Sequence, residues 1–194
     1  MNDIGEARSL ARDFLAEALP RRWSHVQGVA AQAERVATDL GLDRRLLVSA
    51  AWLHDIGYAP QLASTGFHPL DGAVMLAASG WPDRVVALVA HHGEARVTAG
   101  ALGLEVDLLA FPREEGPLTD ALVYADLAAG PDGRRMSLRD RLDAMADWHA
   151  DDPPVLREAW GRRRAALLAA AARTEQRMAG MHRGRLHADP HPSP

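Results

Sequence analysis

The chain has 194 residues, of which 47% are hydrophobic and 25% charged, and its formal net charge is −4. This is the composition of an ordinary globular domain, and it offers no basic surface of the kind that nucleic acids require. Because cysteine is absent, disulfides, thiolate nucleophiles and cysteine-bound metal centres are excluded. Any metal site must use histidine, carboxylate and water ligands, which suit Mn, Fe, Co, Ni or Zn.

The sequence contains no apolar run of about 18 residues or more, the length that a membrane span needs. It also lacks a basic segment followed by an apolar one, as in a secretory leader. We therefore expect a cytoplasmic protein that has neither nucleic acid nor membrane as a partner. The composition does not indicate the substrate.

Apolar residues recur at intervals of three and four along most of the chain, which is the pattern of amphipathic helices. Pro20, Gly41, Gly80 and Gly130 mark the ends of such segments. The predicted helices cover residues 3–19, 23–40, 43–53, 68–78, 81–91, 118–129, 137–148 and 151–178, with a shorter one at 104–110. We find no convincing strand. The sequence thus predicts an all-α, single-domain helical bundle over residues 1–180, followed by a disordered tail at 181–194.

A histidine and a carboxylate lie side by side where the helix at 43–53 ends. Asp43 would cap the start of this helix and Gly57 would stop it, so His54 and Asp55 point at or near the core. A buried carboxylate is costly unless it is paired, and near a helix C-terminus it also meets the unfavourable end of the helix dipole. Asp55 therefore needs a cation, and the only candidate in the sequence pattern is a metal ion shared with other histidines and aspartates.

Further histidines and carboxylates occupy inward positions or helix ends elsewhere. His25 lies four residues before Val29 on an inner stripe, and Asp126 shares a face with Leu122 in a strongly apolar helix. A single such histidine is more often a hydrogen-bonded core residue than a ligand, and Asp126 could instead pair with an arginine. Together they come from five helices and form one candidate set: His25, His54, Asp55, His68, His91, His92 and Asp126.

The order of His25, the His54-Asp55 doublet and Asp126 resembles the HD superfamily of metal-dependent phosphohydrolases. The resemblance spans roughly residues 20–130 of this chain. The single histidine, the His-Asp doublet and the distant aspartate resemble the residues that hold the first metal ion in that family. The resemblance thus implies that these four residues bind one divalent ion.

Additional histidines after the doublet hold a second ion in the two-metal branches of the superfamily. His68 and the pair His91-His92 match that pattern, and Asp55 is the implied bridge between the ions. Either His91 or His92, or both, could be the ligand. The implied cofactors are therefore divalent transition metal ions, two per chain.

A family member of this kind would hydrolyse a phosphate ester or a nucleotide-type phosphoanhydride with a metal-activated water. Asp55 would be catalytic, and His92, if it is not a ligand, could protonate the leaving oxygen. The substrate would be a small phosphorylated molecule such as a nucleotide. Positive charge for such an anion could come from Arg96, Arg134 and Arg135, which lie near the ligand segments, although each is more often a solvated residue.

Two other functions fit the same residues. Some HD-type proteins with this set are similar to diiron oxygenases that use dioxygen on a C–H bond, and others serve as non-catalytic nucleotide-binding or interaction modules. The presence of the second-site histidines argues against a module. Arg162-Arg163-Arg164 is expected to form a solvated face of the last helix, which could equally pack against a second copy in a homodimer.

Overall fold

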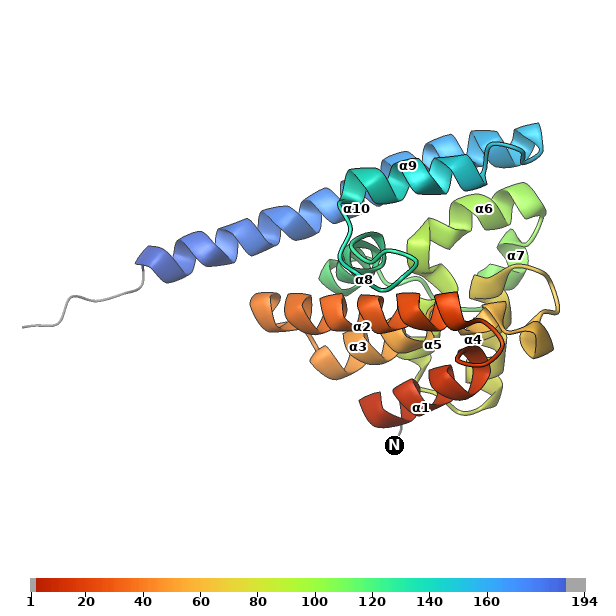
Figure 1. Ribbon diagram of the computed structural model, residues 1–194, viewed down its shortest axis with the longest axis horizontal. Coiled ribbons are helices and arrows are strands. Elements are labelled where there is room, and N and C mark those ends of the chain that lie inside the picture. Colours follow the sequence, from red (N-terminus) through yellow and green to blue (C-terminus); the bar gives the residue numbers. More distant parts are fainter. Residues whose placement is uncertain (1–2, 188–194) are drawn as a thin grey trace, which may run out of the picture.

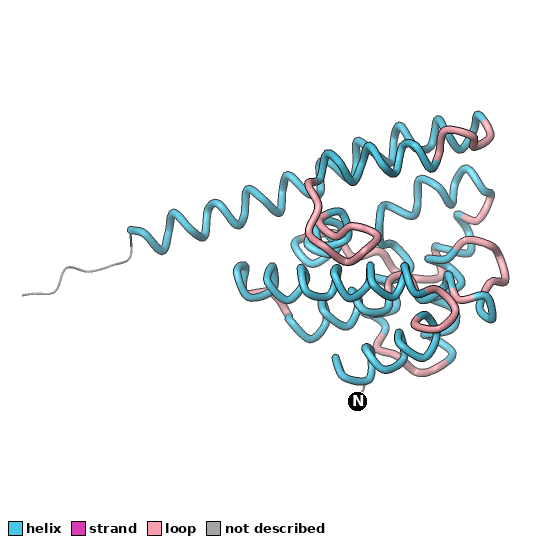
Figure 2. Tube along the Cα trace, in the orientation of Figure 1, coloured by secondary structure: helices cyan, strands magenta, loops and turns pink. Residues whose placement is uncertain are grey.

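The computed structural model describes residues 3–187. The all-α prediction is confirmed: in this range the only β pairing is an isolated bridge between Ala129 and Arg135. The helices are α1 Ile4–Leu15, α2 Pro20–Leu40, α3 Arg44–Leu53, α4 His68–Ala78, α5 Asp83–His91, α6 Ala95–Leu102, α7 Glu105–Leu108, α8 Pro117–Leu127, α9 Leu138–Trp148 and α10 Pro154–His187. Single 3-10 turns lie at η1 Ile56–Tyr58, η2 Pro60–Leu62 and η3 His92–Glu94 (Figures 1 and 2).

Helix α8 lies at the centre of the bundle and packs against α2, α3 and α10 (Figure 1). Nearly all of its residues are buried, so it is apolar on every side instead of amphipathic. On one side, α2 and α3 pack against each other and against α1, and α3 also packs against α5; on the other, α9 and α10 cover α8. None of the helices among residues 3–187 has the length and apolar character that crossing a membrane requires.

Several predicted helix boundaries are confirmed by their caps. Asp43 accepts a hydrogen bond from the backbone of Leu46 at 3.0 Å, and Ser137 accepts one from Asp140 at 3.1 Å. Helix α6 was not predicted, because its buried stripe consists of two alanines and gives a weak periodic signal. Helix α10 continues to residue 187 instead of ending near 178, so residues 181–187 are helical. The rest of the expected tail lies outside the described residues.

Gly57 has a different role from the helix stop that we predicted. Helix α3 already ends just before His54, and Gly57 lies in η1. A methyl group at Gly57 would overlap the carbonyl oxygen of His68 and lie 2.6 Å from the nitrogen of Gly72. Because glycine has no Cβ, the start of α4 can pack directly on η1, which brings His68 close to Asp55.

A cluster of ion pairs fixes α10 against α8. The side chain of Asp120 is 5% exposed and accepts hydrogen bonds from Arg173 at 2.9 and 2.5 Å and from Arg177 at 2.6 Å. Burial raises the pKa of Asp120, but the hydrogen bonds from the two arginines outweigh this effect and lower it. Asp120 is therefore ionised at neutral pH and anchors the middle of α10.

We predict that Asp120→Asn lowers the free energy of unfolding by about 2 kcal/mol at pH 7, since charge-assisted hydrogen bonds are lost. The pKa of this carboxyl is lower in the folded than in the unfolded state. Its contribution is thus present above its unfolded pKa, about 3.9, and is lost as the pH falls through its folded pKa. Urea unfolding at pH 7 and below pH 4 should show the difference between wild type and variant shrinking in acid.

Glu114→Gln is the matched control, because Glu114 forms an exposed ion pair with Arg84 at 2.6 Å. Exposed pairs contribute little, so this variant should change the free energy of unfolding by less than about 0.5 kcal/mol. An equal loss in both variants would show that Asp120 does not anchor α10.

Candidate metal centre

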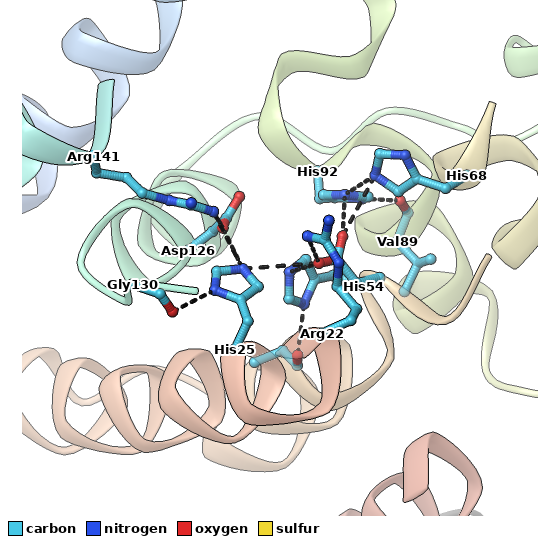
Figure 3. A network of polar contacts seen from close by, with 11 residues as sticks. Arg22, His25, His54, His68, Val89, His92, Asp126, Gly130 and Arg141 are labelled. Atoms are coloured by element: carbon cyan, nitrogen blue, oxygen red, sulfur yellow. Dashed lines mark hydrogen bonds and ion pairs between the residues drawn. The ribbon is translucent and has the colours of Figure 1, made fainter. Parts of the chain in front are cut away.

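Side chains from α2, α4, α8 and the ends of α3 and α5 converge beneath α9 and α10 (Figure 3). They form two groups, and within each group the ligand-type nitrogen and oxygen atoms all lie within 4.8 Å of one another. One group consists of His25, His54 and Asp126, and the other of Asp55, His68 and His92. Imidazole and carboxylate ligands of this kind suit divalent transition metals.

Asp55 lies between the two groups. Its Oδ2 atom faces the first group, 3.3 Å from Nε2 of His54 and 3.8 Å from Nε2 of His25. Its Oδ1 atom faces the second group, 3.4 Å from Nε2 of His68 and 3.7 Å from Nε2 of His92. One carboxylate thus contacts both groups, as a bridging ligand would.

Backbone carbonyls fix the ring orientation of three of the histidines. In each case Nδ1 lies within hydrogen-bond distance of a carbonyl oxygen: 3.1 Å for His25 and Gly130, 2.7 Å for His54 and Ala51, and 2.6 Å for His92 and Val89 (Figure 3). Because a carbonyl oxygen can only accept, each Nδ1 carries a proton and donates it. In the neutral rings the Nε2 lone pairs then point into the site, as they do in metal-ligating histidines.

Nε2 of His25 lies 3.4 Å from the donor Nη2 of Arg141, but the other Nε2 atoms of the site are short of donors. The buried Nε2 of His54 has no hydrogen-bond partner, and Nε2 of His68 lies 3.1 Å from Nε2 of His92. Two ring nitrogens this close to each other and to a carboxylate need a shared proton or metal ion. The donor set therefore fits a bound divalent metal.

A close approach between α2 and the loop after α8 positions His25. A Cβ atom on Gly28 would lie 2.7 Å from Cα of Gly133, which itself adopts a φ of +77°. Glycine at both positions lets this loop lie against α2. As a result, the carbonyl of Gly130 reaches Nδ1 of His25.

Asp55 also has a partner cation within the protein. Nη1 of Arg22 donates a hydrogen bond to Oδ2 of Asp55 at 2.7 Å. Burial raises the pKa of Asp55, but the charge of Arg22 and the contact with His54 outweigh burial and hold the pKa well below its usual range. The prediction that only a metal ion could pair with Asp55 is therefore wrong, because Arg22, three residues before His25 on α2, supplies a positive charge.

Asp126 contacts both kinds of partner expected for it, a histidine of the candidate metal set and an arginine. Its Oδ1 lies 3.0 Å from Nε2 of His25 and 3.5 Å from Nη2 of Arg141. Burial raises the pKa of Asp126, whereas the contacts with His25, His54 and Arg141 lower it far below its usual range. Asp126 is thus ionised, lies in a candidate metal group, and also faces an arginine.

His91 lies outside both groups. Its Nε2 is 2.7 Å from the carbonyl oxygen of Phe111, so this nitrogen carries the proton and points away from Asp55. Burial lowers the pKa of His91. The chain leaves the helical path here, because α5 ends at His91 and the next turn contains Gly93 with a φ of +57°. Consequently only His92 of the adjacent pair turns into the site.

A cavity of about 210 Å³ opens beside the two groups. Asp55, His68, His92 and Asp126 form part of its wall. The cations on the wall are Arg22, Arg141 and Arg163. Three guanidinium groups beside two carboxylates make the cavity suitable for an anion that also binds metal.

These arginines are not the ones that the sequence suggested. Arg163 was expected to be solvated, but its Nε donates to the carbonyl of Gly93 at 2.6 Å, and burial lowers its pKa. The sequence spacing did indicate that Arg163 faces inward, because it lies four residues from each of the buried residues Ala159 and Leu167 on α10. The predicted Arg96 and Arg134 instead form exposed ion pairs with Glu105 and Asp132, and Arg135 is exposed.

Tyr58 and His149 also line the cavity, and neither was a predicted site residue. The ring of Tyr58 stacks on His68 with centroids 3.7 Å apart. Burial and the nearby Asp55 raise the pKa of Tyr58 to about 12, so its hydroxyl stays protonated. Nδ1 of His149 lies 2.7 Å from Oδ2 of Asp152.

Comparison with known proteins agrees with this geometry. The sequence profile of the HD domain family matches residues 22–150, a span that contains every residue of both groups. The chain belongs to the HD domain family. HD domain proteins form a superfamily of metal-dependent phosphohydrolases, and the two histidine–aspartate groups of this HD domain could hold divalent metal.

A curated relative is named Ribonuclease Y and comes from Lactobacillus acidophilus. Over 127 residues it is 42% identical to this HD domain protein, which corresponds to 64% of this chain and 20% of the relative. The chain thus spans about one fifth of the length of that relative. Among solved structures, no significant match was found.

The opposite directions of His91 and His92 give a matched pair of variants. We expect His92→Ala to bind less Mn²⁺ per chain than the wild type, because a ligand of the second group is lost. His91→Ala should keep the wild-type content, since His91 faces Phe111. Elemental analysis of dialysed protein without a His-tag measures the Mn²⁺ content of both variants. An equal loss of Mn²⁺ in the two variants would contradict the assignment of His92 alone as the ligand.

Proposed function

We propose that this HD domain protein is a metal-dependent phosphohydrolase that cleaves a phosphate ester or phosphoanhydride in a small phosphorylated molecule. The observation that carries the proposal is the position of Asp55, whose two oxygens face two histidine groups beside a cavity with three arginines. Divalent ions held by these groups would supply a water of lowered pKa and positive charge for phosphoryl oxygens. We further propose that two such ions bind per chain, with Asp55 between them.

The arginines would bind and orient the anion. Arg22, Arg141 and Arg163 come from three different helices and all line the cavity. Guanidinium groups pair with phosphoryl oxygens through two parallel hydrogen bonds, and partial burial strengthens those bonds. The protonated hydroxyl of Tyr58 is a further donor at the cavity wall.

His92 is better suited to metal binding than to proton transfer. Its Nδ1 proton is committed to the carbonyl of Val89, and its Nε2 faces His68 and Asp55. A general acid would need a proton on the atom that faces the substrate. We therefore propose His92 as a ligand of the second ion, and Asp55 as the bridging ligand.

The same ligands would also suit iron in an oxygenase, but the surrounding charge favours hydrolysis. Three arginines beside the metal groups fit a phosphorylated substrate, whereas an apolar C–H substrate would leave Nε and Nη1 of the buried Arg141 without acceptors. The relative named Ribonuclease Y makes an RNA phosphodiester one of the esters to test. The net charge of −4 and the small cavity favour a small molecule or a strand end over a long duplex.

We expect hydrolysis of bis-p-nitrophenyl phosphate or p-nitrophenyl phosphate with added Mn²⁺, Co²⁺ or Ni²⁺, and its loss in chelator. Arg163→Ala should lower kcat/KM by about 10- to 100-fold, the value of a charged hydrogen bond. Arg164→Ala is the matched control, because the adjacent Arg164 is 40% exposed and lies 3.5 Å from Asp143 on the surface. Turnover that requires both iron and oxygen would instead identify an oxygenase.

Asp55→Asn tests the metal centre through stability. In chelator the variant should melt at a lower temperature than the wild type, because Arg22 loses its partner. Excess Mn²⁺ should raise the melting temperature of the wild type, by a linkage free energy of about 2.7 kcal/mol at a hundredfold excess over Kd. The variant should lose most of that rise, since a neutral amide replaces the bridging carboxylate. An undiminished rise would show that Asp55 is not a metal ligand.

A further inference from the structure

His149 lies on the wall of the cavity beside Asp55 and belongs to neither metal group. It directly follows α9, at the start of the turn that leads into α10 (Figure 1). The cavity has a volume of only about 210 Å³, so a phosphoryl group inside it would come close to every wall. His149 is therefore within reach of a substrate that also reaches the metal groups.

Two contacts hold the imidazole ring of His149. Its Nδ1 lies 2.7 Å from Oδ2 of Asp152. Because a carboxylate can only accept, Nδ1 carries a proton and donates it. One face of the ring stacks on Trp160 of α10, with centroids 4.7 Å and planes 29° apart. With one edge and one face held by neighbours, the ring has a fixed orientation, as a group that transfers protons requires.

The contact with Asp152 leaves Nε2 as the ring nitrogen for a ligand. Asp152 does not line the cavity, whereas His149 does. The edge of the ring that carries Nδ1 is thus directed at the turn, and Nε2 lies on the opposite edge. A carboxylate on Nδ1 with Nε2 turned to the substrate is the arrangement that orients a histidine for proton transfer.

The other residues on the cavity wall are poorly suited to give up a proton. Arginine stays protonated in proteins, the two carboxylates of the metal groups are ionised, and His68 and His92 belong to the second metal group. Tyr58, with a pKa of about 12, holds its proton too tightly for an acid near neutral pH. Among the described residues of the wall, His149 is thus the imidazole left for proton transfer.

We propose that His149 is the general acid of this protein, which gives the proton on Nε2 to the leaving oxygen of a phosphate ester, and that Asp152 is its positioning residue. The proposal rests on the proposed phosphohydrolase function and adds a catalytic residue to it. The oxygen of water forms a bond to phosphorus while the ester P–O bond breaks, and the electron pair of that bond stays on the leaving oxygen. This oxygen takes the Nε2 proton and departs as an alcohol. The neutral ring regains a proton from solvent, which balances the proton that the water has lost.

The test compares two esters that differ in their need for a proton. p-Nitrophenolate can leave as an anion near neutral pH, whereas phenolate, whose conjugate acid has a pKa of about 10 like that of tyrosine, leaves poorly without protonation. In Mn²⁺, His149→Gln should lower kcat/KM for phenyl phosphate by about 100-fold or more, which is the usual contribution of a general acid. The value for p-nitrophenyl phosphate should fall by less than about fivefold. Diphenyl and bis-p-nitrophenyl phosphate give the same comparison for diesters.

Two further variants serve as controls. His182→Ala should leave both values unchanged, because His182 is exposed on α10 with its Nδ1 2.8 Å from the carbonyl oxygen of Met178. Asp152→Asn should lower the value for the phenyl ester by a smaller factor, about 3- to 10-fold, since the pair is partly exposed and an amide oxygen still accepts from Nδ1. Elemental analysis should give the wild-type Mn²⁺ content for every variant, because none changes a residue of either metal group.

A His149→Gln variant that slows both esters by the same factor, or slows neither, overturns the proposal, because a general acid matters most for the poorer leaving group. A loss of Mn²⁺ from this variant also overturns it, since His149 would then be a ligand. In these cases the wild type still hydrolyses the esters, so the phosphohydrolase function stands. A wild-type protein that hydrolyses no phosphate ester in Mn²⁺ rejects both the function and its general acid.

Discussion

The buried carboxylate of Asp55 is the constraint on which the rest of the site depends. An ionised carboxylate is costly to remove from water, and it persists only where positive charge and polar groups surround it. Arg22 on α2 supplies the charge, and histidines from four separate segments of the chain supply the remaining contacts. The packing of α2, α4 and α5 around the end of α3 thus also brings together the histidines and carboxylates of the two candidate metal groups.

The apolar periodicity was sufficient to predict most helices, because the bundle buries one face of most of them and all sides of α8. Asp126 was predictable for a similar reason: a carboxylate in a helix that is otherwise buried has no use except with a cation. The direction of the His91 side chain was not predictable, because it depends on how the chain turns at Gly93. Helix α6 was also missed, since its core contacts come from alanines that look the same in a loop.

The arginines of the cavity show a second limit of the sequence. Arginine is common on surfaces, so Arg22 and Arg163 do not stand out by residue type. Arg163 is the clearer case, because it comes from α10, beyond the segment that matches the HD domain profile. Its position depends on the contact between α10 and α8, where Asp120 holds Arg173 and Arg177 (Figure 1). A charge in the site is therefore positioned by an ion-pair cluster elsewhere on the same helix.

The contact at Gly57 has a consequence for how such sites are recognised. The distance between the His54-Asp55 turn and His68 is set by two backbones that touch, and any side chain at position 57 would hold them apart. A protein could thus retain every histidine and aspartate of the set and still lose the second group through one added methyl group. An inventory of ligand residues alone would then assign two ions to a chain that could hold one. The residue two positions after the doublet is therefore as informative about whether the second group can form as the histidines and aspartates themselves.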